Sequence, residues 1–293
     1  MHEEHPPTLA RRDIRRSFNR AAKTYDQFAV LQREVDTRLA AHLSYVQIAP
    51  QLIIDLGAGT GRAARHLQSQ YKKARVCLID LAPDMLIRAR SQRRWLAREW
   101  YTCADVVALP VRSAAIDLIY SNLMFQWCED LTAAFSECCR VLRPGGLLLF
   151  STLGPNTLKE LRAAWAGVDS KPHVNVFLDM HDVGDKLISA GFNAPVLERD
   201  DLTLTYPDVR AVMRDLQGIG ARNAHRARTR GMTGKSAFAQ VEAAYESFRI
   251  NGALPATYEV VYGHAWAPTV DSRPQDGSTV AYFPLNQLAR RKL

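Results

Sequence analysis

The sequence lacks any apolar run approaching the ~20 residues that a membrane-spanning helix needs. Its first residues, 1–16, are charged, include two adjacent prolines and lack the apolar core of a secretory signal. The five cysteines contain no C-x-x-C pair, and an odd number in a chain of this length is not typical of a disulfide framework. We therefore expect a cytoplasmic protein with reduced thiols and no contact with a membrane.

The sequence also lacks internal repeats, low-complexity tracts and any catalytic triad or metal-ligand spacing, so we expect no metal site. Among its 293 residues, 47% are hydrophobic and 23% are charged, which excludes a mostly disordered chain. The net charge is +8, which attracts anions without specifying which ones. Because no basic platform rich in aromatic residues accompanies this charge, we do not expect nucleic-acid binding.

Apolar patterning predicts strands and helices that alternate along the chain. The first forty residues show helical spacing. Short apolar runs typical of buried parallel strands follow at residues 52–54, 75–80, 100–103, 116–120 and 147–150. A helical stripe over 131–142 precedes Pro144-Gly145-Gly146, which should end the helix. This alternation predicts an α/β fold with a parallel sheet covered by helices on both faces.

The pattern loosens after residue 151. Helices are predicted at 157–166, 180–190, 209–220 and 238–248, and alternation over 258–266 predicts a late strand. The two helices between about 207 and 250 would then interrupt the sheet as an insertion. We divide the chain into an N-terminal helical segment (1–48), a main domain (49–267) and a mobile tail (268–293).

The glycine-rich segment Asp55-Leu56-Gly57-Ala58-Gly59-Thr60-Gly61 is the strongest chemical signal. It follows a predicted strand and opens a helix, where glycines let the backbone approach a ligand. Its spacing is G-x-G-x-G rather than the dinucleotide fingerprint G-x-G-x-x-G. The segment resembles the first motif of class I S-adenosylmethionine-dependent methyltransferases. This resemblance implies a Rossmann-like fold with a mostly parallel seven-stranded sheet, and a cofactor held at Asp55, Gly57, Gly59 and Gly61.

Three further residues end predicted strands and are candidates for the same cofactor. Asp80 lies 19 residues after Gly61, where a carboxylate can accept from ribose hydroxyls. Asp105 follows the third strand, and the resemblance implies that it faces the adenine amino group. Asn122 ends the fourth strand, at the edge where open α/β sheets bind ligands.

A closer resemblance covers roughly residues 14–266. The segments FNRAAKTYD (18–26), SNL with QWC (121–128), LQGIGA (216–221) and LPATY (254–258) are similar to those of the malonyl-[acyl-carrier protein] O-methyltransferases of biotin synthesis. This family methylates the free carboxyl of a malonyl thioester, and the resulting ester primes pimeloyl synthesis. The resemblance implies a carrier protein, or coenzyme A, as the bearer of the malonyl group.

The resemblance also implies roles for two catalytic candidates. Tyr25 would pack over the cofactor and close the site. Arg214, in the insertion, would hold the malonyl carboxylate, which arginine can bind through two parallel hydrogen bonds. Arg222 and His264 are weaker candidates for the same task. The window 210–235 has seven basic residues against one acidic residue, which suits an acidic carrier protein.

Two alternatives remain open from the sequence. Pro172-His173, the LQG segment and PATY (255–258) also resemble respiratory-complex assembly factors, which use the same fold without methylating. A methyltransferase acting on a small molecule such as a quinone is the second alternative. Arg214 and the segment around Tyr25 favour the malonyl methyltransferase.

Overall fold

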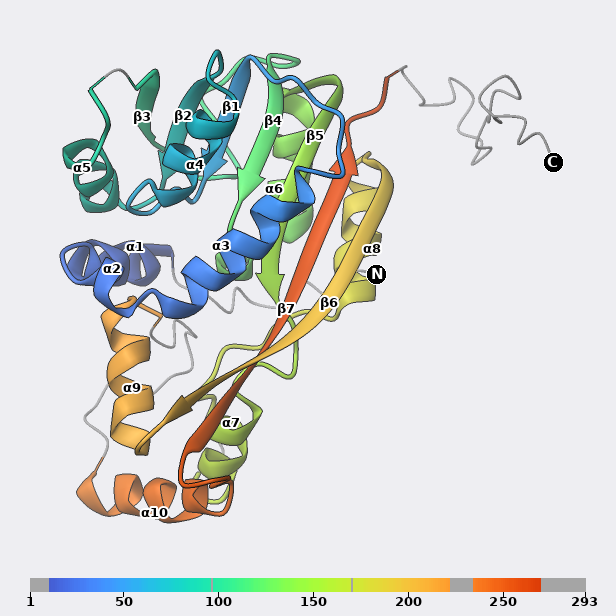
Figure 1. Cartoon of the computed structure of the whole chain (residues 1–293). Helices are drawn as coiled ribbons and strands as arrows, with labels where there is room; N and C mark the ends of the chain where they lie inside the picture. Colours follow the sequence, from blue (N-terminus) through green and yellow to red (C-terminus); the bar gives the residue numbers. More distant parts are fainter. Residues whose placement is uncertain (1–10, 96, 170, 222–233, 270–293) are drawn as a thin grey trace.

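A computed structural model describes residues 11–95, 97–169, 171–221 and 234–269 (Figure 1). Within them, seven strands form one sheet in the order β3-β2-β1-β4-β5-β7-β6. The strands β1 to β5 run parallel, and β7 pairs antiparallel with both β5 and β6. The predicted Rossmann-like methyltransferase fold is confirmed. The strands are β1 (Leu52–Leu56), β2 (Arg75–Asp80), β3 (Glu99–Cys103), β4 (Ile116–Ser121), β5 (Leu142–Leu153), β6 (Asn193–Tyr206) and β7 (Leu254–Trp266).

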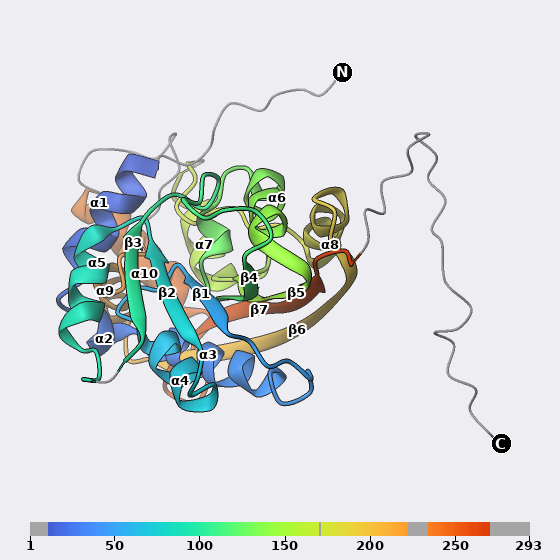
Figure 2. The ribbon, with the colours of Figure 1, turned by 90° about the horizontal axis from the view of Figure 1, so that it is seen from above.

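Helices cover both faces of this sheet, as the view from above shows (Figure 2). On one face, α3 (Val30–His42), α4 (Arg62–Gln70) and α5 (Pro83–Ser91) contribute to one apolar core. On the other, α6 (Leu131–Val141) and α8 (Met180–Ser189) contribute to a second. Every residue of β4 is buried, which explains why the central strands show continuous apolar runs.

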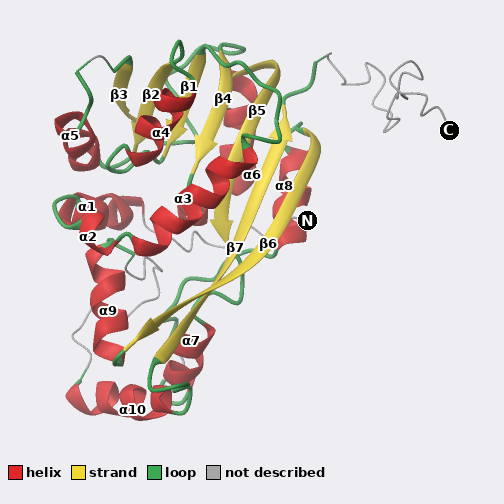
Figure 3. Ribbon diagram, in the orientation of Figure 1, coloured by secondary structure: helices red, strands yellow, loops and turns green. Residues whose placement is uncertain are grey.

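The strand pattern differs from the sequence prediction at three points (Figure 3). The prediction had no strand at β6, because this edge strand alternates in exposure and carries four charged residues in a row. β5 begins directly after α6, since Gly145 donates to the carbonyl of Ala267 and Ala267 donates to Gly146, which extends the ladder. β7 begins four residues earlier than predicted. The predicted end of α6 before Pro144 is confirmed.

The remaining helices lie beyond the carboxyl ends of the parallel strands (Figure 1). The first two are α1 (Arg11–Ala21) and α2 (Tyr25–Phe28); α7 (Lys159–Ala166) follows β5, and α9 (Val209–Gly218) with α10 (Lys235–Glu246) lies between β6 and β7. A short 3₁₀ helix, η1 (Phe125–Trp127), follows β4. Among the described residues, none of the helices is long and apolar enough to cross a membrane. Of the predicted tail, 268–293, residues 270–293 lie outside the described residues.

Candidate functional site

The loop between β1 and α4 has a backbone that favours glycine. Gly57 and Gly59 have φ angles of 74° and 52°, in the left-handed region. A Cβ atom at Gly57 would lie only 2.4 Å from Cγ of Met124, so no larger residue fits there. The loop therefore presents main chain without bulky side chains to a ligand at the N-terminal end of α4.

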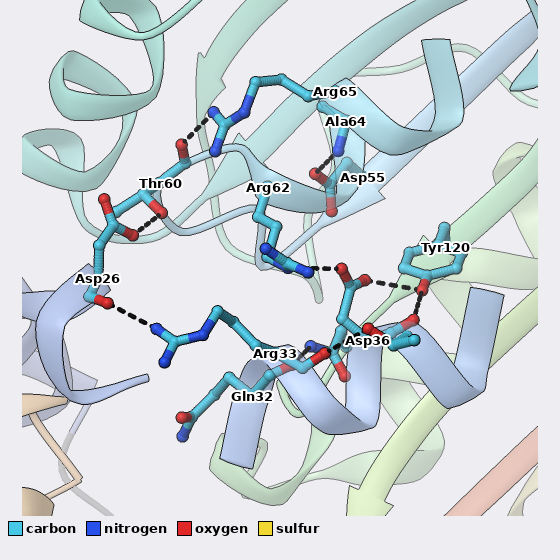
Figure 4. Close-up of polar contacts among 12 residues, drawn as sticks. Asp26, Gln32, Arg33, Asp36, Asp55, Thr60, Arg62, Ala64, Arg65 and Tyr120 are labelled. Carbon is cyan, nitrogen blue, oxygen red and sulfur yellow. Dashed lines mark hydrogen bonds and ion pairs between the residues drawn. The ribbon is translucent and has the colours of Figure 1, made fainter. Parts of the chain in front are cut away.

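Asp55, at the end of β1, holds this loop in place and lies near a buried polar network (Figure 4). Its carboxylate accepts a hydrogen bond of 3.0 Å from the N–H of Ala64, in the first turn of α4. Burial, and next the negative charge of Asp36, raise the pKa of Asp55 to about 8. Asp36 itself accepts from the hydroxyl of Tyr120 at 2.8 Å and from Nε of Arg62 at 3.2 Å. Asp55 thus fixes the path from strand to helix.

The next two acids follow β2 and β3. Asp80 accepts from the N–H groups of Gly59 and Ala82, at 2.9 and 2.8 Å. Burial raises the pKa of Asp80. Asp105 forms an ion pair of 3.0 Å with Arg11 of α1, so the first helix is tied to the end of β3. Both carboxylates keep lone pairs with which they can accept from a ligand.

A cavity of about 110 Å³ opens where β1 to β4 end. Its lining includes five of the predicted cofactor residues, Gly57, Gly59, Asp80, Asp105 and Asn122. An adjoining cavity of about 160 Å³ shares the glycine loop and is lined by Asp55 as well. Gly61 lines neither cavity. It packs against α5 instead, where a Cβ atom would lie 3.0 Å from Cβ of Ala89.

Asn122 connects three elements at this edge of the sheet. Its Nδ2 donates to the main-chain carbonyl of Gln32 in α3 at 3.0 Å. Its Oδ1 accepts from the hydroxyl of Ser151 in β5 at 2.8 Å. The amide is therefore already bonded at both ends and shapes the cavity wall.

A third and larger cavity, of about 480 Å³, adjoins the other two. Tyr25 of α2 lines all three. Phe18, Leu123 and Trp127 line both the large cavity and the one of about 110 Å³. Burial, followed by the negative charge of Asp80, raises the pKa of Tyr25, so its phenol stays protonated. Tyr25 therefore lies where the three cavities meet.

Asp26, the neighbour of Tyr25, ties α2 to the glycine loop (Figure 4). Its Oδ1 accepts from the hydroxyl of Thr60 at 2.6 Å, and its Oδ2 accepts from Nε2 of Gln92 at 2.9 Å. Its main-chain carbonyl accepts from Arg33 at 2.7 Å. These bonds hold Tyr25 over Gly59, where the nearest ring carbon would lie 4.0 Å from an added Cβ atom.

One wall of the large cavity, formed by Trp165, Asp169, residues 171–175 and Phe177, carries ionisable groups. The ring of His173 stacks on Trp165, with centroids 3.6 Å apart, and its Nε2 lies 2.8 Å from Oδ1 of Asp169. The main-chain N–H of Lys171 also bonds to Asp169. Among the described residues that line this cavity, Lys171 and His173 are the basic ones.

The predicted carboxylate-binding residues lie elsewhere in the structure. Arg214 is on the exposed side of α9, whereas its helix neighbours Met213 and Gln217 line the large cavity. His264 lies within β7 and lines none of the three cavities, and burial lowers its pKa. Arg222 lies outside the described residues. Arg214 therefore shares a helix with two residues that line the cavity but does not line it itself, and neither does His264.

Comparison with known proteins agrees with this geometry. A family model described as "Methyltransferase domain" matches residues 54–150. The malonyl-[acyl-carrier protein] O-methyltransferase of Methylovorus sp. is 50% identical over 276 residues, covering 92% of this chain and 93% of its own. That of Gallionella capsiferriformans is 49% identical, covering 89% and 92%. This chain belongs to the malonyl-[acyl-carrier protein] O-methyltransferase family. The predicted family, enzyme class and methyl donor, S-adenosylmethionine, are therefore confirmed.

Solved structures share the fold at low sequence identity. The YcgJ protein of Bacillus subtilis matches this family member with a TM-score of 0.57 at 15% identity, covering 78% of this chain and 97% of its own. Phosphoethanolamine N-methyltransferase 2 of Haemonchus contortus, solved with S-adenosyl-L-methionine, gives a TM-score of 0.51 at 16% identity, covering 85% and 57%. These likenesses support the methyltransferase fold alone.

Sequence reasoning missed several residues that shape the site of this O-methyltransferase family member. Asp26 and Thr60 lie in segments named in the sequence analysis, but the sequence assigns them no role. The hydrogen bond between them joins residues far apart in the chain and forms only in the folded structure. Asp169 and Lys171 carry no motif, and their place in the cavity wall depends on how the segment after α7 folds back. The stretch of mixed charge and histidine at 169–173 is the only signal that could have drawn attention to them.

Proposed function

We propose that this chain transfers the methyl group of S-adenosylmethionine to the free carboxylate of a malonyl group carried by an acyl carrier protein. The product is the malonyl methyl ester that primes pimeloyl synthesis for biotin. The position of Tyr25 is the observation that carries this proposal. Because Tyr25 lines all three cavities, a methyl donor at the carboxyl ends of β1 to β4 faces an acceptor in the large cavity.

The residues around the glycine loop suit the chemistry of this cofactor. It bears hydroxyls, an amine and an ammonium group as donors, and the carboxylates of Asp80 and Asp105 are acceptors on the cavity wall. Gly57 and Gly59 leave the main chain open beside them, and we propose that Gly61 supports the loop by packing against α5. Asp55 and Asn122 act on the cofactor by holding the loop and the end of β4 in position.

When bound, S-adenosylmethionine supplies an activated methyl group on a sulfonium. The chain must then align the acceptor and exclude water. A carboxylate is ionised near neutral pH, so no residue needs to remove a proton. A protonated Tyr25 agrees with this, because it can close the site and orient groups without acting as a base. The apolar side chains of Phe18, Leu123 and Trp127, which line both cavities, exclude water from the place where these cavities meet.

The malonyl carboxylate requires a cationic partner in this apolar setting. We propose that Arg214 supplies it from the rim of the cavity, since α9 lines the cavity through the adjacent Met213 and Gln217. Lys171 is the second candidate, because it belongs to the lining itself. His173 lies in the same wall, with its Nε2 2.8 Å from Oδ1 of Asp169.

An acidic carrier protein suits the surplus of basic residues in the window 210–235. Charge of this kind mainly accelerates encounter. Coenzyme A carries the same arm and is the alternative bearer of the malonyl group. A carrier-protein partner also agrees with the cytoplasmic location expected from the sequence.

Transfer of label to malonyl-carrier protein tests the proposal. The protein is incubated with methyl-labelled cofactor and malonyl-carrier protein, and mild base is then added. Carboxyl methyl esters release labelled methanol, whereas methylated amines and carbons do not. Volatile label that requires the malonyl group is the expected result. No transfer despite cofactor binding would favour a non-methylating role like that of the assembly factors, and transfer to a quinone alone would favour a small-molecule enzyme.

A further inference from the structure

One edge of the sheet carries a basic surface that the proposed function does not use. Residues 88–98 hold five arginines and no acidic residue. Arg75 begins β2 beside the start of β3, since Val76 pairs with Glu99 in the ladder. Seven basic side chains here are exposed and, within the described part of the chain, form no ion pair. These residues, which we call the basic edge surface, are Lys72, Lys73, Arg75, Arg90, Arg93, Arg94 and Arg98.

Two exposed tryptophans accompany the basic edge surface. Trp95 is 92% exposed and Trp100 is 49% exposed. The guanidinium of Arg75 lies over the ring of Trp100, 5.6 Å from its centroid. Charge alone can protect a sheet edge from aggregation, but such protection does not require exposed aromatic rings. Tryptophan and arginine are among the residues that carry most of the binding energy at protein interfaces, so this combination indicates a docking surface.

The strand beside this surface has a free edge. β3 is the end strand of the sheet, and each of its residues is at least partly exposed. The carbonyl of Arg98 and the N–H of Ala104 bond to β2, at 3.0 and 3.2 Å. Because main-chain groups alternate between the two sides of a strand, those of Glu99, Tyr101 and Cys103 point away from β2. They form a row of donors and acceptors with which a further strand can pair.

The charge along this free edge has one sign. Glu99 is the only acidic residue between positions 88 and 103, and it already accepts from the hydroxyl of Tyr101. Burial, and next the bond to Glu99, raise the pKa of Tyr101, while the charges of Arg93 and Arg90 oppose this rise. Both arginines therefore act directly on β3. A second copy of this edge would be repelled, whereas a strand with acidic side chains would be attracted.

The basic edge surface is separate from the three cavities. None of its residues lines any of them. Lys72 and Lys73 precede β2, and residues 92–95 precede β3, so they lie toward the amino ends of these strands (Figure 1). The cofactor residues lie at the carboxyl ends of the same strands. A partner bound to this surface therefore leaves the cavities open.

We infer that the basic edge surface docks an extended acidic segment of another protein, which pairs with β3 as a further strand. Peptides that add to a sheet edge gain affinity from main-chain hydrogen bonds and specificity from alternate side chains. The acidic side chains of the segment meet the arginines, and its apolar side chains meet the tryptophans. Neither a lipid headgroup nor a nucleic acid has a main chain that matches the repeat of a strand. This inference goes beyond methyl transfer and does not depend on the acceptor.

A library of short random segments displayed on phage tests the inference. Segments retained by the parent protein should alternate acidic and apolar residues. The best of them, made as a synthetic peptide, should bind with a Kd that rises with salt, because screening weakens attraction between exposed charges. In the double variant Arg93→Glu with Arg94→Glu, this Kd should rise by about tenfold or more, the effect of losing principal contacts at an interface.

A matched double variant separates local contacts from overall charge. Arg112→Glu with Lys159→Glu changes the net charge by the same amount at two other exposed positions, and it should weaken the peptide far less. Trp100→Ala should weaken the peptide with no change of charge. The Kd for S-adenosylmethionine should stay unchanged in the Arg93→Glu with Arg94→Glu variant, since neither residue lines a cavity. An unchanged value also shows that this variant is folded.

Two N-methylated forms of the best peptide test the pairing with β3. Methylation of every second main-chain nitrogen removes the N–H donors from one side of an extended segment. The form that keeps the donors facing β3 should bind like the unmodified peptide, and the alternate form should lose about tenfold or more. Equal affinities of the two forms would overturn the inference, because they would show that no strand is added.

Other outcomes also overturn the inference. Retained segments without acidic residues, or a set retained equally by the Arg93→Glu with Arg94→Glu variant, would show that the arginines dock no acidic segment. A single-stranded RNA oligomer that binds more tightly than any peptide and is lost in this variant would assign the surface to nucleic acid. The same result with phosphatidylserine vesicles would assign it to a membrane.

Discussion

The ring of Phe28, at the end of α2, occupies the space that a side chain on Gly218 of α9 would need. A Cβ atom at Gly218 would lie 2.3 Å from two ring carbons. The hydroxyl of Ser17 in α1 donates to the carbonyl of Gly220, just beyond, at 2.9 Å. The N-terminal helices and the helix after β6 therefore dock on each other through glycines, and together they cover the junction at Tyr25.

Substituting Gly218 tests this docking. Gly218→Ala should displace Phe28 and lower kcat/KM by about tenfold or more, because small shifts at a positioned site cost large factors in rate. Stability should fall by only ~1–3 kcal/mol, the usual cost of overpacking. Steady-state kinetics and urea unfolding measure the two. Gly167→Ala is the control, because Gly167 has a helical backbone and an added Cβ atom there meets nothing nearer than 3.9 Å. Equal kinetic losses in both variants would contradict the prediction.

The tether between Asp26 and Thr60 should govern cofactor retention. Asp26→Ala removes the acceptor that holds α2 on the glycine loop, so Tyr25 closes less often over the cofactor. We expect the Kd for S-adenosylmethionine, measured by calorimetry, to rise about tenfold to a hundredfold, the range of one charge-assisted hydrogen bond. Thr60→Val should act in the same direction. An exposed aspartate of α8 gives the control Asp185→Ala, which should leave the Kd unchanged.

Much of the fold follows from local pattern. The strands β1, β2 and β4 are short apolar runs buried on both faces. Such runs can be recognised as strands from the sequence alone. β6 was not predicted, because four charged residues interrupt it and its partner β7 lies about fifty residues further along. Its apolar face is confined to the second half, where Leu202, Leu204 and Tyr206 pack against the core. An edge strand of this kind is defined by its neighbour.

The candidate site was predictable where one segment carries the chemistry. The glycine loop and Asp80 line the expected cavity because a strand, a turn and a helix bring them there. The direction of the Arg214 side chain could not be predicted in this way, because it depends on how α9 rotates about its axis. The side that faces the cavity carries Met213 and Gln217, and packing against α2 and β6 sets that rotation.

The buried carboxylates predict a pH dependence of stability. The pKa of Asp55 rises from its ordinary value of 3.8 to about 8 in the fold. Its contribution is therefore fully present below pH 4 and is lost as the pH rises through about 8. Asp55→Asn keeps an acceptor for Ala64 and has no proton to lose. Relative to the parent, the variant should gain more than about 1 kcal/mol in free energy of unfolding between pH 5 and pH 9.

Urea denaturation at several pH values, without cofactor, measures this difference. Asp185→Asn is the matched control, because its side chain is exposed and should show no such gain. A constant difference between parent and Asp55→Asn across the range would contradict the assignment of the raised pKa. The part of the parent's pH dependence of stability that does not come from Asp55 should have the same sign, since burial also raises the pKa values of Asp36 and Asp80.

Arg214 and Lys171 are the two candidates to bind the malonyl carboxylate. If Arg214 holds it, Arg214→Ala should raise the KM for malonyl-carrier protein by about tenfold or more, with the KM for cofactor nearly unchanged. If Lys171 holds the carboxylate instead, Lys171→Ala should give the larger increase in the KM for malonyl-carrier protein. Arg210→Ala is the control on the same helix, because Arg210 already pairs with Glu242 at 2.7 Å. Equal increases in both Michaelis constants would count against either residue.

The strand β7 lies between β5 and β6, although it follows both in the chain. Both strands that pair with β7 are therefore synthesised before β7 itself. During synthesis, β6 and the helices after it have no sheet to join until residues 254–266 have left the ribosome. The five parallel strands with their glycine loop can assemble earlier. The half of the molecule proposed to bind the donor can therefore form first, and the half proposed to enclose the acceptor is completed by the last strand.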